Sequence, residues 1–518
     1  MTADEVVRRI RAFECGKPLP RGETLRVSRL PDEQVMILAF VKMGGESSPW
    51  GIAFGRPGKR PEILTTPEPR TRDDVAEMVA KLGPALLTHL NHPQYSPWGP
   101  SPDTQVPPFQ VWLPNASHLE MLHHLAYAYT FTKFGAAARF TRLNQIGQAC
   151  GWLFRESQRP GQTITMVATE ALTEAYTFPA ETTRQGHLGF LLAWLQTKGG
   201  RDARARAAAD AERESISTNL DPAVERDELA PDVEMYNEAR SSGDADRLDL
   251  ATRRIHKMLT EELQRRYRLT EQAIAALKAD RRRENRGLDV LVKASLDEHR
   301  LQYRRIEREI DDREDGPAFR PSPETDRYPP AAGSRFYVHE ASQKLRDQLL
   351  IHDDRELQAE LVASGAAFAG TIIDVRDEGE GKKTIPVWVV ESNGELPLRL
   401  REDSTLCVVG LRDRQLRVRD IERTGDMRYR FELVVTKLVT VPRDGDGSVL
   451  AATSPKLKRQ RVVLVKPSMD QIARRRSFLI WKRDVPGAWL THRVPKVPAA
   501  DLPVEVAEDL TALDANRK

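Results

Sequence analysis

Apolar residues between 250 and 312 recur with the spacing of a helix face. One set follows steps of three, four and seven residues, and a second set with the same spacing begins after Gly287. A glycine between two such sets is typical of a turn or a kink. The pattern predicts an antiparallel helical hairpin, or stalk, over residues 246–315. Two ordinary helices of a globular domain are the alternative. The first set is Ile255, Leu259, Leu263, Tyr267, Ile274 and Leu277, and the second includes Leu288, Leu291, Val292, Leu296, Tyr303, Ile306 and Ile310.

The pattern changes after residue 366 to short runs rich in β-branched residues. These runs lie at 368–375, 384–390, 396–400, 405–409 and 415–419, and 431–435 can supply a last strand. Turn signals separate them at 378–381, 392–394 and 401–403. Short strands at this regular spacing favour a small closed β-barrel, which we assign to residues 336–445.

The other residues divide by composition, and the predicted fold class is α+β and multidomain. An N-terminal small α+β domain (1–113) is followed by a helical domain (114–199) rich in aromatic residues. Two segments read as linkers, one charged (200–245) and one Pro-rich (316–335). A basic C-terminal segment (446–518) ends in a short helix.

Positive charge is concentrated in two stretches. The chain has 79 Lys and Arg and 76 Asp and Glu, a formal net charge of +3. Residues 251–310 carry +6 and residues 456–493 carry +9, so the rest of the chain carries −12. This segregation indicates a polyanionic partner that is bound by selected faces.

A two-helix stalk that carries a small barrel resembles the insertion of superfamily 1B helicases of the senataxin and nonsense-decay type. The resemblance covers residues 250–440 and includes Gly370–Val375, which enters the barrel, and Leu400–Gly410, which crosses it. Residues 513–518, after a short acidic helix at 504–513, are similar to the lead-in to the first ATPase strand of these helicases. The resemblance implies a barrel that stands over a nucleic-acid channel and an ATPase core that follows it.

The motif of such a motor is missing from this chain. A P-loop requires Gly-x-x-x-x-Gly-Lys-Ser/Thr, because backbone amides, a lysine and a hydroxyl together hold phosphates and magnesium. The Gly-Lys pairs at 16–17, 58–59 and 381–382 are followed by Pro, Arg and Lys. We therefore assign no catalytic residue, and we expect the motor on a separate polypeptide or downstream in a longer protein.

Two basic surfaces are candidates for contact with nucleic acid. In the C-terminal segment cations lie beside aromatic residues, which stack on unpaired bases with about 1–3 kcal/mol each. In the barrel, Arg417 and Arg419 alternate with Val418 and so share one strand face. Two plainer interpretations remain open, in which the tryptophans are core residues and the arginines form an ordinary solvated face. The candidates are Arg399, Arg401, Arg417, Arg419, Lys456, Lys458, Arg459, Arg474, Arg475, Arg476, Trp481 and Trp489.

No metal, cofactor or membrane partner is expected. The three cysteines are too few and too scattered for a disulfide framework or a zinc site, which favours a reducing, cytoplasmic location. The histidines at 118, 123 and 124 lack the His-Glu-x-x-His spacing of a metal site. No run of eighteen apolar residues is present.

The leading hypothesis is a nucleic-acid-binding accessory module of a superfamily 1B-like helicase, which grips a single or double strand for an ATPase partner. A bacterial antiviral defence system is one expected setting. Two alternatives remain, a coiled-coil scaffold for protein interactions and an enzyme without a recognisable motif in residues 1–197. The sequence does not distinguish DNA from RNA.

Overall fold

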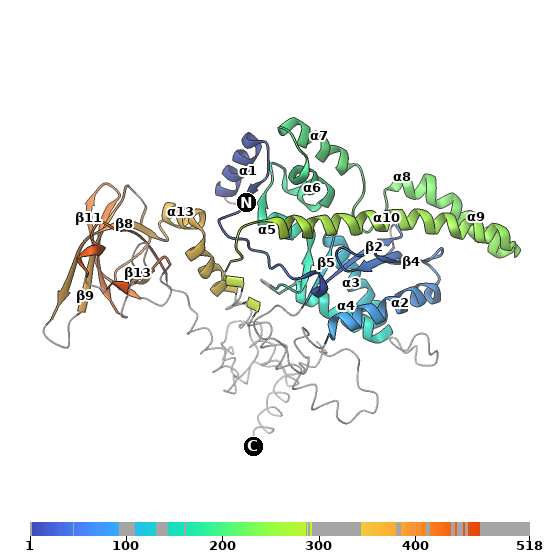
Figure 1. The fold of residues 1–518 in the computed structure, drawn as a ribbon, viewed down its shortest axis with the longest axis horizontal. Coiled ribbons are helices and arrows are strands. Elements are labelled where there is room, and N and C mark those ends of the chain that lie inside the picture. The colour runs from blue at the N-terminus through green and yellow to red at the C-terminus, as the bar shows by residue number, and fades with distance from the viewer. Residues whose placement is uncertain are drawn as a thin grey trace, which may run out of the picture. The chain divides into compact units, whose positions relative to one another are not determined.

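The computed structural model describes residues 3–44, 46–92, 109–130, 143–159, 162–285, 287–288, 291–292, 343–379, 385–395, 397–410, 415–436, 441–442, 449–450 and 454–466. The chain divides into two compact units, and all of these residues belong to the unit formed by 1–322 and 343–468. Within them the fold is mixed α+β, with an open five-stranded sheet and a closed barrel (Figure 1).

The open sheet has the strand order β4-β3-β2-β5-β6. β2, β3 and β4 form an antiparallel meander, and β5 and β6 run parallel to β2. β2 is a continuous apolar run because it is covered on both faces. Residues 37, 39 and 41 of β2 enter one core, and residues 36, 38 and 40 enter the other. The strands are β2 (Val35–Lys42), β3 (Pro49–Gly55), β4 (Glu62–Thr65), β5 (Gln110–Leu113) and β6 (Thr165–Val167).

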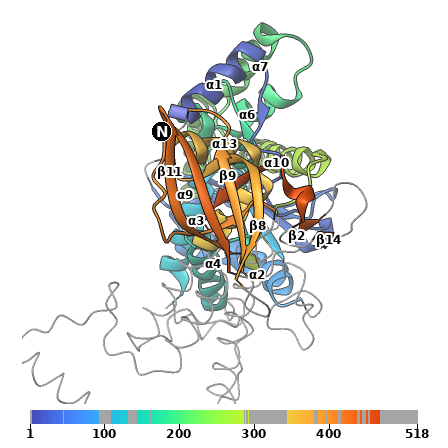
Figure 2. The same cartoon turned by 90° about the vertical axis from the view of Figure 1, so that its left-hand side faces the viewer.

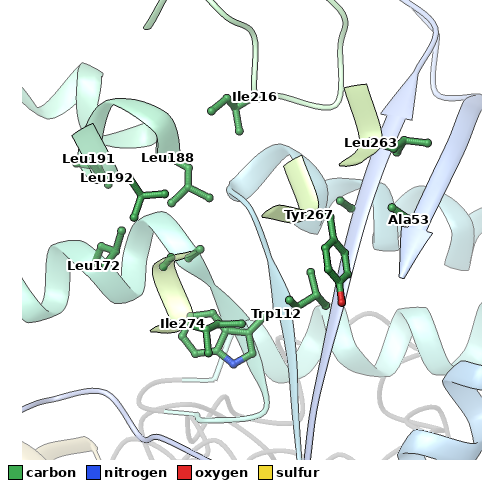
Figure 3. Packing of buried hydrophobic residues seen from close by; sticks show 14 of the residues in the cluster. Ala53, Trp112, Leu172, Leu188, Leu191, Leu192, Ile216, Leu263, Tyr267 and Ile274 are labelled. Carbon is green, nitrogen blue, oxygen red and sulfur yellow. The ribbon is translucent and has the colours of Figure 1, made fainter. Parts of the chain in front are cut away.

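Helices cover both faces of this sheet. One face packs on α2 (Arg72–Leu90), α3 (Ala116–Tyr129) and α4 (Leu143–Ser157). The other packs on α5 (Ala168–Ala175), α6 (Leu188–Gln196) and α10 (Ala245–Ala279), as Figure 3 shows for the residues around Trp112 and Tyr267. Among the described residues, no helix combines the length and the apolar character needed to cross a bilayer. Smaller elements are α1 (Ala3–Cys15), β1 (Leu19–Pro20), which pairs with β7 (Tyr176–Thr177), and 3-10 turns at Asp32–Gln34 and Thr182–Gly186.

The predicted boundary between a domain at 1–113 and a helical domain at 114–199 is wrong. β5 pairs with β2 on one side and with β6 on the other, so the two segments share one sheet. Residues from both segments also occur in both cores.

The predicted linker at 200–245 is also wrong, because this segment is helical and contributes to the core. It forms α7 (Arg201–Glu212), α8 (Pro222–Val224), a π-helical turn (Glu225–Leu229) and α9 (Ala230–Ser242). Ala208, Ile216, Leu220, Leu229 and Tyr236 are buried in the core shared with α10. Gly243, at φ +74°, ends α9 in the left-handed conformation that favours glycine and leads the chain into α10.

Part of the predicted hairpin forms α10, whose 35 residues bury one face at the expected spacing, and the hairpin itself stays a prediction. The buried face of α10 packs on the open sheet of the same chain. A Cβ atom at Gly51 of β3 would stand 2.8 Å from a methyl carbon of Leu263, and one at Gly55 would stand 3.0 Å from the Tyr267 hydroxyl. The glycines therefore let the helix approach the strand closely. The predicted second helix, 288–310, lies almost entirely outside the described residues, as does the Pro-rich linker at 316–335.

The predicted barrel is confirmed as a closed six-stranded antiparallel barrel in the order β10-β11-β12-β9-β8-β15 (Figure 2). Phe368, Trp388, Phe431 and Leu464 fill its interior. The run at 397–400 is not a strand, although Leu400 enters the core. The predicted end of the barrel at 445 is wrong, because β15 closes it. Its strands are β8 (Phe368–Glu378), β9 (Ile385–Ser392), β10 (Thr405–Val408), β11 (Leu416–Gly425), β12 (Arg428–Val435) and β15 (Arg461–Val465).

Short elements flank the barrel. Helical residues 343–353 and α13 (Arg355–Ala363) precede β8, with Asp354 as the N-cap of α13. The Asp354 side chain accepts hydrogen bonds from the backbone N–H groups of Glu356 and Leu357 and pairs with Arg26 at 2.9 Å. β13 (Val441–Pro442) pairs with β14 (Val449–Leu450), and a 3-10 turn (Pro455–Leu457) leads to β15.

A fully buried arginine holds the segment 216–219 between β2, α3 and α10. Arg266 of α10 donates from Nε to the Ser217 carbonyl at 2.9 Å and from Nη2 to the Asn219 carbonyl at 3.2 Å. Its Nη1 atom donates to a carboxylate oxygen of Glu262 at 2.6 Å. Burial lowers the pKa of Arg266 to about 10, opposed by the Glu262 charge, so the guanidinium remains charged at neutral pH.

The Arg266→Met variant should lower the free energy of unfolding by about 3 kcal/mol, because it leaves two backbone carbonyls without their buried donor, while Glu262 keeps its pair with Arg265. Urea unfolding at pH 7.5 measures this change. Arg253→Met on the same helix is the control, because Arg253 forms an exposed pair with Asp249 and should contribute less than about 1 kcal/mol. Equal losses in the two variants would contradict a stabilising role for the buried pair.

Candidate nucleic-acid interface

Two of the predicted nucleic-acid-binding arginines flank a buried valine on β11 but have different surroundings. Arg417 and Arg419 are exposed on either side of Val418. Arg419 donates from Nη1 to Glu378 at 2.6 Å and to Glu432 at 2.7 Å. Arg417 lies opposite Thr405 in the ladder and forms no ion pair with any described residue. The two arginines therefore differ in the charge they offer to a ligand.

Arg419 belongs to a network of two arginines and two glutamates on the outside of the barrel. Arg376 donates to the same two carboxylates, to Glu378 at 2.9 Å and to Glu432 at 2.8 Å. Hydrogen bonds from Arg419 and Arg376 hold the pKa of Glu378 below its ordinary value. The formal charge of these four side chains is zero, so the network offers no net cation to a phosphate.

The network lies over apolar residues on the outer face. In the ladder, Arg376 is opposite Val387 and Glu432 is opposite Val389, and both valines are buried. The aliphatic stems of the charged side chains can cover such a surface while their heads stay in water. The presence of Arg376 and Arg419 is therefore explained by their ion pairs and by the apolar surface that they cover. Arg417 forms no ion pair with a described residue.

The segment before β10 presents two further exposed cations. Arg399 and Arg401 are exposed and form no ion pair among the described residues. Their backbone is fixed, because the Arg399 N–H donates to the Gly365 carbonyl and the Arg401 N–H to the Ser404 hydroxyl. The same turn is bonded to β11, since the Val418 N–H donates to the Ser404 carbonyl at 2.9 Å. Arg401 and Arg417 therefore flank one rigid turn.

A second group of cations precedes β15. Lys458 pairs with Asp374 of β8 at 2.7 Å, and this hydrogen bond lowers the pKa of Asp374. Lys456 and Arg459 are exposed without an ion pair among the described residues. Arg461, which was not among the predicted contacts, is exposed and unpaired in the same sense. The sequence signal for Arg461 was its position beside the other cations, directly before the apolar run of β15.

The remaining predicted contacts, Arg474, Arg475, Arg476, Trp481 and Trp489, lie outside the described residues. Their part in nucleic-acid binding stays a prediction.

His118 is structural. Its ring is completely buried, its Nδ1 atom accepts from the Phe40 N–H at 3.0 Å, and its Nε2 atom lies 3.0 Å from the Ile216 carbonyl. These partners fix the neutral tautomer that carries hydrogen on Nε2. Within the described ranges no group of three or more His, Cys, Asp or Glu side chains is placed to hold a metal ion.

Two of the concave sites in the part of the chain that carries the open sheet lie beside its strands. One, of about 280 Å³, lies at the carboxyl ends of β5 and β6 and is lined by Asn115, Thr169 and Glu170. Burial and the neighbouring Glu174 raise the pKa of Glu170. The other, of about 410 Å³, lies beside the turn between β3 and β4. Neither was predicted, because each combines residues from elements far apart in the sequence.

Comparisons of this chain with protein-family models, with curated proteins and with solved structures found no match.

Acid should destabilise the protein partly through His118. Burial lowers its pKa from 6.5 to about 3, so below pH 6.5 the unfolded chain binds a proton that the folded chain does not. Its contribution is complete above pH 6.5 and is lost at about 1.4 kcal/mol per pH unit as the pH falls towards 3. Between pH 7.5 and 5.5 the wild type should lose about 1.4 kcal/mol more unfolding free energy than His118→Gln in urea titrations. Identical pH dependence of the two proteins would show that His118 is not neutral in the fold.

Proposed function

We propose that this chain is a nucleic-acid-binding accessory module whose barrel contacts a phosphate backbone for a helicase-type ATPase, supplied downstream or in trans. One observation carries the proposal. Some exposed barrel cations are paired with carboxylates, as Arg376, Arg419 and Lys458 are. Others have no ion pair among the described residues, namely Arg399, Arg401, Arg417, Lys456, Arg459 and Arg461.

Unpaired cations on a rigid scaffold suit the chemistry of a phosphate backbone. Binding to successive phosphates releases counterions, so affinity comes from charge and position, without readout of bases. A closed barrel keeps these positions fixed and leaves no open sheet edge. A helicase that moves along a strand meets every base sequence, so contacts that do not depend on sequence are needed. Such contacts are the supporting role that we expect for a module beside an ATPase motor.

The two alternative functions receive less support. A coiled-coil scaffold would use the apolar face of α10, but this face packs on the protein's own sheet. An enzyme confined to residues 1–197 would lack α9 and α10, which supply Tyr236, Ile255, Leu259 and Tyr267 to the core. A fragment that ends near residue 200 is therefore unsuitable as a test, and the whole chain should be used.

Replacing Arg399, Arg401 and Arg417 together with alanine should weaken binding to single-stranded nucleic acid and flatten its salt dependence. Each lost phosphate contact reduces the slope of log affinity against log salt concentration by about 0.7 on a single strand, so the triple variant should lose about 2. Fluorescence anisotropy with labelled single-stranded and duplex DNA and RNA, each over a salt series, measures both quantities.

The matched control is the double variant Arg419→Gln with Glu378→Gln, which alters the same outer face without changing the net charge. Its affinity and slope should match those of the wild type. Wild-type affinity and slope in the triple variant would remove the three arginines from the interface. An equal loss in the control would mean that the fold of this face, and not its unpaired charge, determines binding.

A further inference from the structure

The turn between β3 and β4 forms one wall of a cavity of about 410 Å³ in the sheet-bearing part of the chain. Met36 and Phe54 line it from the sheet, and Pro84 and Ala85 line it from α2. This volume lies within the range of about 300–1,000 Å³ for small-ligand sites. The cavity is separate from the barrel residues of the proposed interface.

Three cations of the turn line this cavity. Arg56, Lys59 and Arg60 are exposed, and none of them forms an ion pair with a described residue. Glu62 is the acidic residue of the lining. His89 also lines it, but burial lowers its pKa to about 4, so its imidazole is neutral at pH 7. The cavity therefore carries a formal charge of +2 at neutral pH.

The turn is fixed from behind by α10. The Tyr267 hydroxyl donates to the Arg56 carbonyl at 2.8 Å, and the Gly58 N–H donates to the Glu271 carboxylate. The Lys59 N–H donates to the Arg56 carbonyl at 3.1 Å, and Gly58 has φ +74°. Because these bonds hold the backbone, only the side-chain ends need to be ordered when an anion binds. Such preorganisation lowers the cost of binding.

We propose that this cavity binds a phosphate group carried by a nucleoside, with the phosphate on Arg56, Lys59 and Arg60 and the nucleoside against the apolar wall. Arginine and lysine donate charge-assisted hydrogen bonds to phosphate oxygens. The apolar wall formed by Met36, Phe54 and Pro84 suits a flat base better than it suits inorganic phosphate alone. The ligand is a free nucleotide or the phosphorylated terminal nucleotide of a strand. The assignment does not rest on the barrel interface.

The test is calorimetric titration of the full chain with inorganic phosphate, a nucleoside monophosphate, the matching nucleoside, and a short oligonucleotide with and without a 5′-phosphate. The wild type should bind the monophosphate at least about tenfold more tightly than either phosphate or the nucleoside, since both parts of the cavity contribute. Preference for the free monophosphate identifies a nucleotide site. Preference for the 5′-phosphorylated over the 5′-hydroxyl oligonucleotide identifies a strand-end site.

Two variants with opposite expected effects test the residues. Arg56→Ala, Lys59→Ala and Arg60→Ala together should weaken binding of the monophosphate by about tenfold or more, and Glu62→Gln should strengthen it severalfold. Arg417→Ala in the barrel should leave this affinity unchanged, which separates the cavity from the proposed interface. All substituted side chains are exposed, so the urea midpoint should stay constant and confirm folding. Absence of saturable monophosphate binding by the wild type, or unchanged affinity in the triple variant, would overturn the assignment.

Discussion

The buried contact between Arg266 and the segment 216–219 is the constraint on which the sheet-bearing part of the chain depends. The segment lies beside β2, where the Lys42 N–H donates to the Thr218 carbonyl at 2.7 Å. His118 of α3 lies within hydrogen-bond distance of the Ile216 carbonyl, and Arg266 of α10 binds the carbonyls of Ser217 and Asn219. All four carbonyls thus lie within hydrogen-bond distance of a donor, which the buried residues Ile216 and Thr218 in particular require. Through this irregular segment, hydrogen bonds join a strand of the sheet and one helix from each of its faces.

Sequence patterns predicted the barrel and α10 but not the boundaries between domains. The barrel strands are runs rich in β-branched residues that are separated by turn signals, and α10 repeats its apolar positions over many turns, so both signals extend over many residues. β5 and β6 have four and three residues, which is too short for a period to appear among helices. The segment 200–245 read as a linker because α7 buries a single residue, Ala208, and α9 only Tyr236 and Ala239. Most residues of α7 and α9 are not buried, so the amino-acid composition of these helices gives little sign of the few residues that enter the core.

The sequence could predict which types of residue lie at the candidate interface, but not which of its arginines form ion pairs. Arg417 and Arg419 are indistinguishable in a strand pattern, and only the pairing of the strands β11, β12, β9 and β8 brings Glu378 and Glu432 to Arg419. The same limit applies to the cavity beside the β3–β4 turn. Its basic run was visible in the sequence, but the apolar wall comes from β2 and α2. The sequence shows which residues are charged, but only the folded structure shows which of these charges are already paired with a carboxylate.

The position of β15 also determines when the barrel can form. β15 pairs with both β8 and β10, yet it begins only at Arg461, long after β8 ends at Glu378. During synthesis α10 and the whole open sheet precede the first barrel strand, so this part can fold early. β8 and β10, in contrast, keep bare hydrogen-bonding edges until Arg461–Val465 is made. Until this late closure the newly made barrel exposes two strand edges, while the finished barrel leaves no edge for another strand to join.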